Sequence, residues 1–140
     1  MLHFTQMTVQ DYDQVAALWR TTEGIGLHDD CDSKAGITHY LQRNDGLSFV
    51  ARQHGQLIGA VLCGHDGRRG YLHHLAVAPK WRGQGIGHAL IRHCLAALAA
   101  VGITKCHAFV FADHKPAHYF WQHVGWTERT DLKVVSTTSP

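Results

Sequence analysis

The sequence predicts one α/β domain over residues 1–140, and three observations support that prediction. The chain has 140 residues, of which 45% are hydrophobic and 17% charged, the balance of a soluble globular domain. Segments with strand and helix periodicity follow one another in the order β-α-α-β-β-β-α-β-α-β. In the middle of the chain an apolar strand, a proline and three glycines lead directly into an apolar helix. Together these features indicate a mixed sheet with few helices.

The N-terminal segment is expected to form a strand followed by a helix. Residues 2–5 alternate between polar and apolar side chains, which predicts the first strand. Thr8 begins the helix because Asp11, three residues later, is its capping partner. The apolar side chains within residues 12–19 fall on one face of that helix, which we expect to pack on the sheet.

A loop, a second helix and a hairpin are expected next. Residues 23–32 have the composition of a loop, and Ser33 can cap a short helix that ends near Arg43. Residues 47–53 and 57–64 are apolar runs on either side of a tight turn that contains glycine. This pattern predicts a β-hairpin.

The strand over residues 71–78 is the one that leads into the glycine-rich stretch. Strict alternation places its odd-numbered positions on one face and His74 on the other. The odd-numbered positions are Tyr71, His73, Leu75 and Val77.

The C-terminal half continues with two helices and further strands. Apolar residues at helical spacing predict a helix over 86–101, and residues 105–111 predict a strand. A short helix is expected to carry Pro116 in its first turn. Residues 126–136 are expected to supply one or two closing strands.

Charge and composition argue against several classes of protein. The net charge of +2 gives no reason to expect a nucleic-acid or membrane partner. No apolar run approaches the ~20 residues of a membrane span, and the first residues lack the pattern of a signal peptide. The four cysteines form no CxxC pair, which favours a reducing cytoplasm over a disulfide framework. The 13 histidines show no ligand spacing of a known metal site, so no metal is expected.

The stretch "APKWRGQGIGHALI", residues 78–91, contains three glycines within five residues. It lacks the Lys-Ser or Lys-Thr of a P-loop and the third glycine of a dinucleotide fingerprint. A plain turn explains the glycines, and so does a site where backbone N–H groups at a helix N-terminus bind phosphate. Arg82 would add a charged donor to such a site. Local chemistry leaves both interpretations open.

Two motifs resemble those of one enzyme family. "LAVAPKWRGQGIGHALI" resembles the acetyl-CoA signature of the GNAT superfamily, the Gcn5-related N-acetyltransferases, through Arg82, Gly85 and Gly87. "PAHYFWQHVGW" is similar to the second CoA segment of that superfamily. The resemblance covers nearly the whole chain and is greatest to small bacterial members with unassigned acceptors. It implies a central mixed, mostly antiparallel twisted sheet flanked by about four helices.

The resemblance also implies an activity and a cosubstrate-binding surface. The activity would be transfer of the acetyl group of acetyl-CoA to a primary amine of a small molecule or peptide, by direct attack in a ternary complex. A CoA-binding sensor without turnover is the alternative. Backbone N–H groups of the glycine-rich stretch would hold the pyrophosphate, and the preceding strand would bind the pantetheine arm. The residues so implied are Leu75, Ala76, Val77, Arg82, Gly83, Gln84, Gly85, Ile86, Gly87 and His88, with His114, Ala117, Phe120 and Trp121 near the thiol.

Amine acetylation requires a base for the amine proton, a hydrogen-bond donor that stabilises the oxyanion, and a way for the thiolate to leave. Tyr71, His73 and His74 are candidates for the base, and the resemblance makes the N–H of Val77 the oxyanion donor. Trp121 stands where the family often places a tyrosine acid, and an indole cannot transfer that proton. We therefore expect the thiolate to leave with help from water or from this indole.

The acceptor itself is expected to meet an acidic rim. Four carboxylates lie in the loop between the first two helices, where they would attract a cationic amine; they are Glu23, Asp29, Asp30 and Asp32. An ordinary solvated loop, with a carboxylate capping the second helix, explains them as well. Cys31 has no predicted histidine partner, so a covalent intermediate on that thiol is not expected. Dimers are frequent in the superfamily, which makes a homodimer an expectation too.

Overall fold

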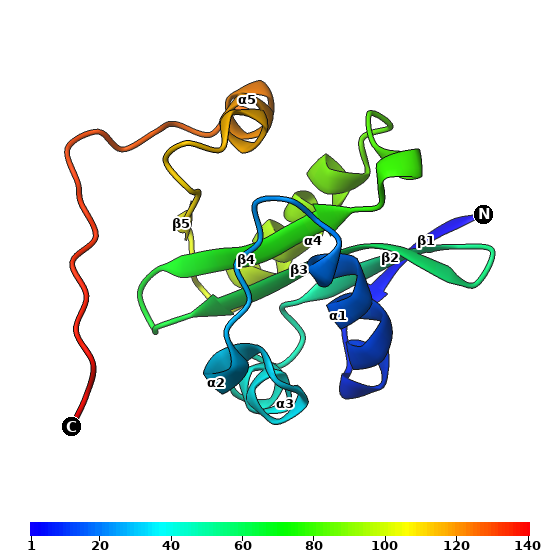
Figure 1. Ribbon diagram of the computed structural model, residues 1–140, viewed down its shortest axis with the longest axis horizontal. Coiled ribbons are helices and arrows are strands. Elements are labelled where there is room, and N and C mark those ends of the chain that lie inside the picture. Colours follow the sequence, from blue (N-terminus) through cyan, green and yellow to red (C-terminus); the bar gives the residue numbers. More distant parts are fainter. The chain divides into compact units, whose positions relative to one another are not determined.

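A computed structural model describes all 140 residues and contains one five-stranded sheet (Figure 1). Strand order along the sheet follows the chain, from β1 to β5. The first four strands are antiparallel neighbours, and β5 runs parallel to β4. The strands are β1 (Leu2–Gln6), β2 (Phe49–Gln53), β3 (Gln56–His65), β4 (Gly70–Val77) and β5 (Cys106–Ala108). The predicted mixed, mostly antiparallel α/β sheet is therefore confirmed.

Five α-helices and two short 3-10 helices complete the chain. The α-helices are α1 (Tyr12–Arg20), α2 (Asp29–Asp32), α3 (Lys34–Arg43), α4 (Ile86–Ala100) and α5 (Lys115–His123). The 3-10 helices are η1 (Val9–Asp11) and η2 (Pro79–Trp81). None of the helices is long and apolar enough to cross a lipid bilayer.

The chain divides into two compact units. Met1–Phe109 forms the first, which contains the whole sheet and the helices α1 to α4. Val110–Pro140 forms the second, which contains α5 and a C-terminal segment without regular structure. The expectation of a single domain over residues 1–140 stays a prediction.

Helices cover both faces of the sheet in the first unit. Figure 1 shows α1 and α3 on one face and α4 on the other. Glycines in the strands mark the close approaches: a Cβ on Gly64 would meet Tyr40 and Asn44 of the α3 side, and one on Gly70 would meet Leu98 of α4. Buried side chains from α1, α3 and the sheet form an apolar cluster, of which Trp19 is the largest member.

The helix beginnings follow the sequence signals. The backbone N–H of Thr8 donates to Asp11 Oδ2 at 2.9 Å, so the expected capping pair is present. Ser33 Oγ accepts from the N–H of Gly36 at 3.1 Å and caps α3, as predicted. Pro116 lies in the first turn of α5, where its missing N–H costs no hydrogen bond.

The secondary structure predicted for three segments was wrong. The segment 23–32, predicted to be a loop, contains α2. The N–H of Asp32 donates to the carbonyl of His28, and the N–H of His28 donates to Asp32 Oδ2, so the two residues close a helical turn. The strand expected over 105–111 is only three residues long, since β5 pairs with Gly70–Leu72 alone. No strand forms within residues 126–136, because the second unit contains no other strand for them to pair with.

Candidate functional site

A bulge interrupts β4 at its second histidine. Ala60 pairs with Ala76 and Leu62 pairs with His73, so two residues of β4 oppose one residue of β3 between those pairs. The first of the two is His74, which adopts a left-handed backbone with φ of +55°. Histidine is among the residues that enter this region most often.

The bulge overturns the predicted alternation. The rings of His73 and His74 lie 6.4 Å apart, and the α1/α3 side of the sheet supplies contacts to both. Tyr40 of α3 is 6.3 Å from the ring of His73, and Trp19 of α1 is 5.0 Å from the ring of His74. The prediction that these histidines face opposite ways was wrong, because the extra residue shifts the side-chain period by one.

Beyond Leu72, β4 has a free edge. Its neighbour β5 ends at Ala108, which pairs with Leu72, so residues 73–77 have no strand on that side. The N–H of Ala78 donates to the carbonyl of Ile58 on β3 at 2.8 Å. Val77, one residue earlier, therefore directs its backbone groups to the opposite, free edge. An extended ligand could add to the sheet there.

The glycine-rich stretch forms an open backbone turn before α4. Gly83 and Gly85 have φ of +77° and +80°, and a Cβ on either would meet nothing within 4 Å. The first hydrogen bond of the helix runs from the N–H of Ala89 to the carbonyl of Gly85. The N–H groups of the preceding residues, up to His88, thus have no acceptor within the helix. Unpaired N–H groups at a helix N-terminus are a common binding place for anions.

Arg82 closes the turn against the end of β4. Its Nε donates to the carbonyl of Val77 at 2.8 Å, while the side chain stays exposed. This bond occupies one of the five guanidinium N–H groups and leaves the two terminal nitrogens for an anion. The first turn of α4 carries no acidic residue that would oppose a phosphate there.

The other cosubstrate candidates divide into exposed and buried positions. Gln84 and His88 are exposed beside the turn, whereas the side chains of Ala76 and Ile86 are buried in the core. Ala76 and Ile86 can therefore offer only backbone groups to a ligand.

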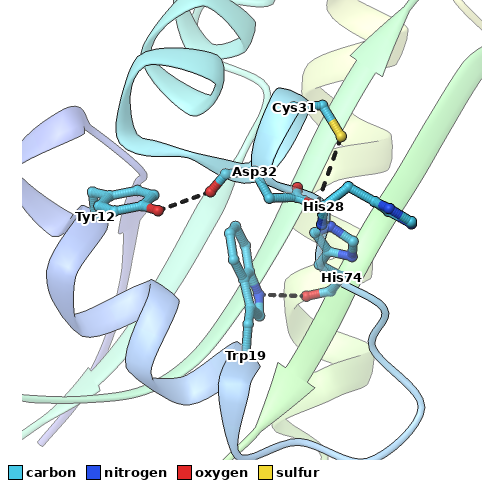
Figure 2. Close-up of polar contacts among 6 residues, drawn as sticks. All are labelled: Tyr12, Trp19, His28, Cys31, Asp32 and His74. Carbon is cyan, nitrogen blue, oxygen red and sulfur yellow. Dashed lines mark hydrogen bonds and ion pairs between the residues drawn. The ribbon is translucent and has the colours of Figure 1, made fainter.

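Asp32 and His74 form a hydrogen-bonded pair on the α1/α3 side of the sheet (Figure 2). Asp32 Oδ1 lies 2.9 Å from His74 Nε2, and only 7% of the aspartate side chain is exposed. The indole Nε1–H of Trp19 donates to the carbonyl of His74 at 2.8 Å, which holds the bulge from α1. Tyr12 donates its hydroxyl to the carbonyl of Asp32, also at 2.8 Å. Side chains 42 residues apart in sequence are thus fixed together.

Burial sets the protonation of the groups around this pair. Burial, and then the charge of neighbouring His74, lowers the pKa of His73, so this ring is neutral at pH 7. Burial raises the pKa of the Tyr40 hydroxyl, which stays protonated. Burial and the adjacent carboxylates raise the pKa of the Cys31 thiol to about 11, which keeps it from acting as a nucleophile.

The predicted acidic rim separates into two parts. Glu23, Asp29 and Asp30 are exposed to solvent, whereas the carboxylate of Asp32 turns inward to the histidine. No group of three or more histidine, cysteine, aspartate or glutamate side chains is arranged to hold a metal ion.

The candidates near the thiol lie in the second unit. His114 precedes α5, and Ala117, Phe120 and Trp121 lie on it. The indole of Trp121 packs against Trp126 at 4.5 Å between ring centroids. Tyr119, the nearest tyrosine in sequence, is 67% exposed.

Sequence reasoning did not identify Trp19 or Tyr12 as part of the site. Their spacing predicts only that they lie on the apolar face of a helix. The available signal was their polar atoms, since a tryptophan or tyrosine in a packed face needs a partner for its N–H or O–H group.

Comparison with known proteins identifies the family. A model described as the acetyltransferase (GNAT) family matches residues 12–126. The chain belongs to the GNAT acetyltransferase family. This membership confirms the predicted enzyme class, an acetyltransferase that uses acetyl-CoA, and the fold that the resemblance implied.

Relatives of similar length support the same assignment to GNAT. An acetyltransferase of Photorhabdus laumondii is 30% identical over 125 residues, which are 89% of this chain and 86% of the relative. An acetyltransferase of Pectobacterium atrosepticum is 34% identical and covers 89% of this chain and 83% of the relative. Among solved structures, an aminoglycoside N-acetyltransferase, AAC(6')-Iy, in complex with CoA has a TM-score of 0.78 at 20% identity. That match covers 99% of this chain and 95% of the other, and it shows the same fold.

Proposed function

We propose that this GNAT enzyme acetylates a primary amine of a small molecule or peptide by direct attack in a ternary complex, with His74 taking the amine proton. The observation that carries the proposal is the Asp32–His74 pair beside the free edge of β4. The proposed cosubstrate residues lie shortly after His74 in the chain, in the order Val77, Arg82 and the open turn.

The open turn and the free edge fit acetyl-CoA. The N–H groups between Gly83 and His88, with Arg82, would bind the pyrophosphate, and the backbone at Leu75 and Val77 would bind the pantetheine arm. Bound acetyl-CoA supplies the activated thioester that an amine can attack. The N–H of Val77 faces the free edge and can stabilise the negative charge that develops on a carbonyl oxygen there.

A base is needed because the acceptor arrives as a cation. A lysine-like amine with a pKa of about 10.4 is only ~0.04% neutral at pH 7. Asp32 accepts at Nε2 of His74, which leaves Nδ1 with a lone pair for the amine proton. Cys31 remains a protonated thiol, so a covalent acetyl-cysteine has no support and direct attack by the amine is the simpler route.

A cationic acceptor also fits the surface around the pair. Glu23, Asp29 and Asp30 are exposed and can attract a cation before it docks. A structure of the same fold is named an aminoglycoside N-acetyltransferase, which makes amino sugars one member of the test panel. The four cysteines are free, which supports the expectation of a reducing cytoplasm, and the homodimer stays a prediction.

The proposed function is tested by incubating the protein with acetyl-CoA and a panel of amines, and following the release of free thiol. The panel contains amino sugars, polyamines, free amino acids and peptides with a free N-terminus or lysine. We expect thiol release that depends on at least one acceptor, with the acetylated amine detected by mass spectrometry. Binding of acetyl-CoA without release for any acceptor would favour the sensor without turnover.

Replacement of Trp121 by phenylalanine is expected to leave kcat within about threefold of the wild-type value. An indole cannot deliver a proton near neutral pH, and a thiol with a pKa of about 8.5 can leave as the thiolate. Initial rates at saturating acetyl-CoA measure the effect. A loss of tenfold or more, with the acetyl-CoA affinity unchanged in calorimetry, would assign the indole a role in the departure of the thiol.

A further inference from the structure

Asp32 differs from the neighbouring acidic side chains in its surroundings. Asp29 and Asp30 are exposed, yet the Asp32 side chain is only 7% exposed and lies against His74, which is 17% exposed. A carboxylate is rarely buried unless it is paired, because its charge loses the solvation of water. The burial of Asp32 therefore depends on the groups that surround it.

Three segments of the chain fix the position of Asp32. Its Oδ2 accepts the backbone N–H of His28 at 2.8 Å and is 3.7 Å from the thiol of Cys31. Its carbonyl accepts the hydroxyl of Tyr12 from α1 at 2.8 Å. Gly36 of α3 allows α2 to approach, since a Cβ there would lie 2.5 Å from the carbonyl oxygen of Cys31. The other carboxylate oxygen, Oδ1, is therefore free to pair with His74, and it lies 2.9 Å from Nε2 of that ring (Figure 2).

We propose that Asp32 is the positioning residue of His74: it holds the imidazole in the Nε2–H tautomer, so that Nδ1 is the atom that receives the amine proton. The inference rests on the proposed role of His74 as the base. It gives Asp32 a different task from the one the sequence predicted, which was direct attraction of the acceptor.

The groups around His74 agree with a role for Asp32 as the positioning residue and for His74 as the base. The groups that face it are Asp32 from α2, Trp19 from α1 and His73 on its own strand, with neutral Tyr40 of α3 behind His73. A proton on His74 would lie beside a carboxylate, whereas a proton on His73 would be buried and repelled by a charged His74. His74, which has the carboxylate beside it, is therefore better placed than His73 to receive the amine proton.

The tautomer can be measured without any turnover. Long-range ¹H–¹⁵N NMR spectra of the free enzyme, above the pH at which the ring is charged, distinguish Nε2–H from Nδ1–H, and the His74→Asn variant assigns the signal by its loss. We expect the Nε2–H form in the wild type and a mixture in Asp32→Asn, whose amide can donate as well as accept. An Nδ1–H signal, or a mixture, in the wild type would overturn the proposal even if the base assignment holds.

Kinetics then separate positioning from acceptor binding. Asp32→Asn is expected to lower kcat by roughly 10- to 100-fold, at the low end of what a general base contributes, with the KM of the amine unchanged. Asp32→Glu should restore part of the rate. A raised KM for the amine at unchanged kcat would show that Asp32 binds the acceptor and would overturn the proposal.

Two further variants complete the experiment. The exposed carboxylate of Asp45 serves as the matched control, and Asp45→Asn should leave kcat and the KM of the amine unchanged. In the His74→Asn background, Asp32→Asn should cause no additional loss, because a residue that acts through His74 has nothing left to position. An independent loss in the double variant would overturn the proposal, whereas full activity of His74→Asn alone would instead contradict the proposed function.

Discussion

Replacement of His74 by asparagine is expected to lower kcat by on the order of 10²- to 10⁴-fold, the usual contribution of a general base. Asparagine is the appropriate substitute because it tolerates the left-handed backbone at this position and cannot accept a proton near neutral pH. The affinity for acetyl-CoA should stay unchanged, since the open turn and Val77 are untouched. Steady-state rates and calorimetric titration with acetyl-CoA measure the two effects separately.

The control is a histidine with similar ring contacts elsewhere in the chain. His93 of α4 stacks on Phe4 at 5.0 Å and is tilted against Phe49 at 5.2 Å between ring centroids. His93→Asn removes an imidazole from an aromatic setting and should leave kcat unchanged. If His73→Asn abolishes turnover while His74→Asn does not, the base is His73 and the assignment made here is wrong.

Replacement of Gly85 by alanine is expected to weaken acetyl-CoA binding by roughly 10- to 100-fold. A methyl group there would fill the open side of the turn and push a pyrophosphate from the N–H groups that should bind it. Loss of one or two charge-assisted hydrogen bonds corresponds to about 1.5–3 kcal/mol, which gives that range. Fluorescence or calorimetric titration with CoA measures it.

Gly55 provides a close match for the backbone effect of this change. Its φ of +77° is close to the +80° of Gly85, and a Cβ at either position would meet nothing within 4 Å. Both alanine variants should lose about 1–2 kcal/mol of folding stability from the left-handed conformation. Only Gly85→Ala should lose affinity for CoA. Equal affinities in the two variants would mean that the turn does not bind the cosubstrate.

Local signals in the sequence predicted most of the fold. Ser33 and the Thr8–Asp11 pair marked helix beginnings correctly, because a cap is a contact within three residues. The glycines at 83 and 85 marked the open turn, since a positive φ restricts the residue types that fit. Features that depend on the nearest few residues can thus be predicted from the sequence.

The parts of the site that sequence reasoning missed depend on distant residues. Asp32 lies 42 positions before His74, and no local pattern relates the two. The bulge in β4 depends on how that strand pairs with β3, and it reverses the face of His74. Nothing in the local sequence "HHLAV" indicates the bulge. The prediction of strands in residues 126–136 was wrong for a related reason, because residues with high β-propensity form a strand only where a partner strand is present.

The left-handed backbone at His74 limits the side chains that position 74 can accommodate. Glycine, asparagine, aspartate and histidine adopt this conformation most readily, and β-branched residues such as valine or threonine do so at considerable cost. Of the four permissive residues, histidine is the one whose ordinary pKa lies near neutrality. Random substitution at this codon would therefore yield mostly variants that either distort the bulge or keep it and lose the base. The same turn of the backbone that brings the imidazole to Asp32 makes the position hard to replace.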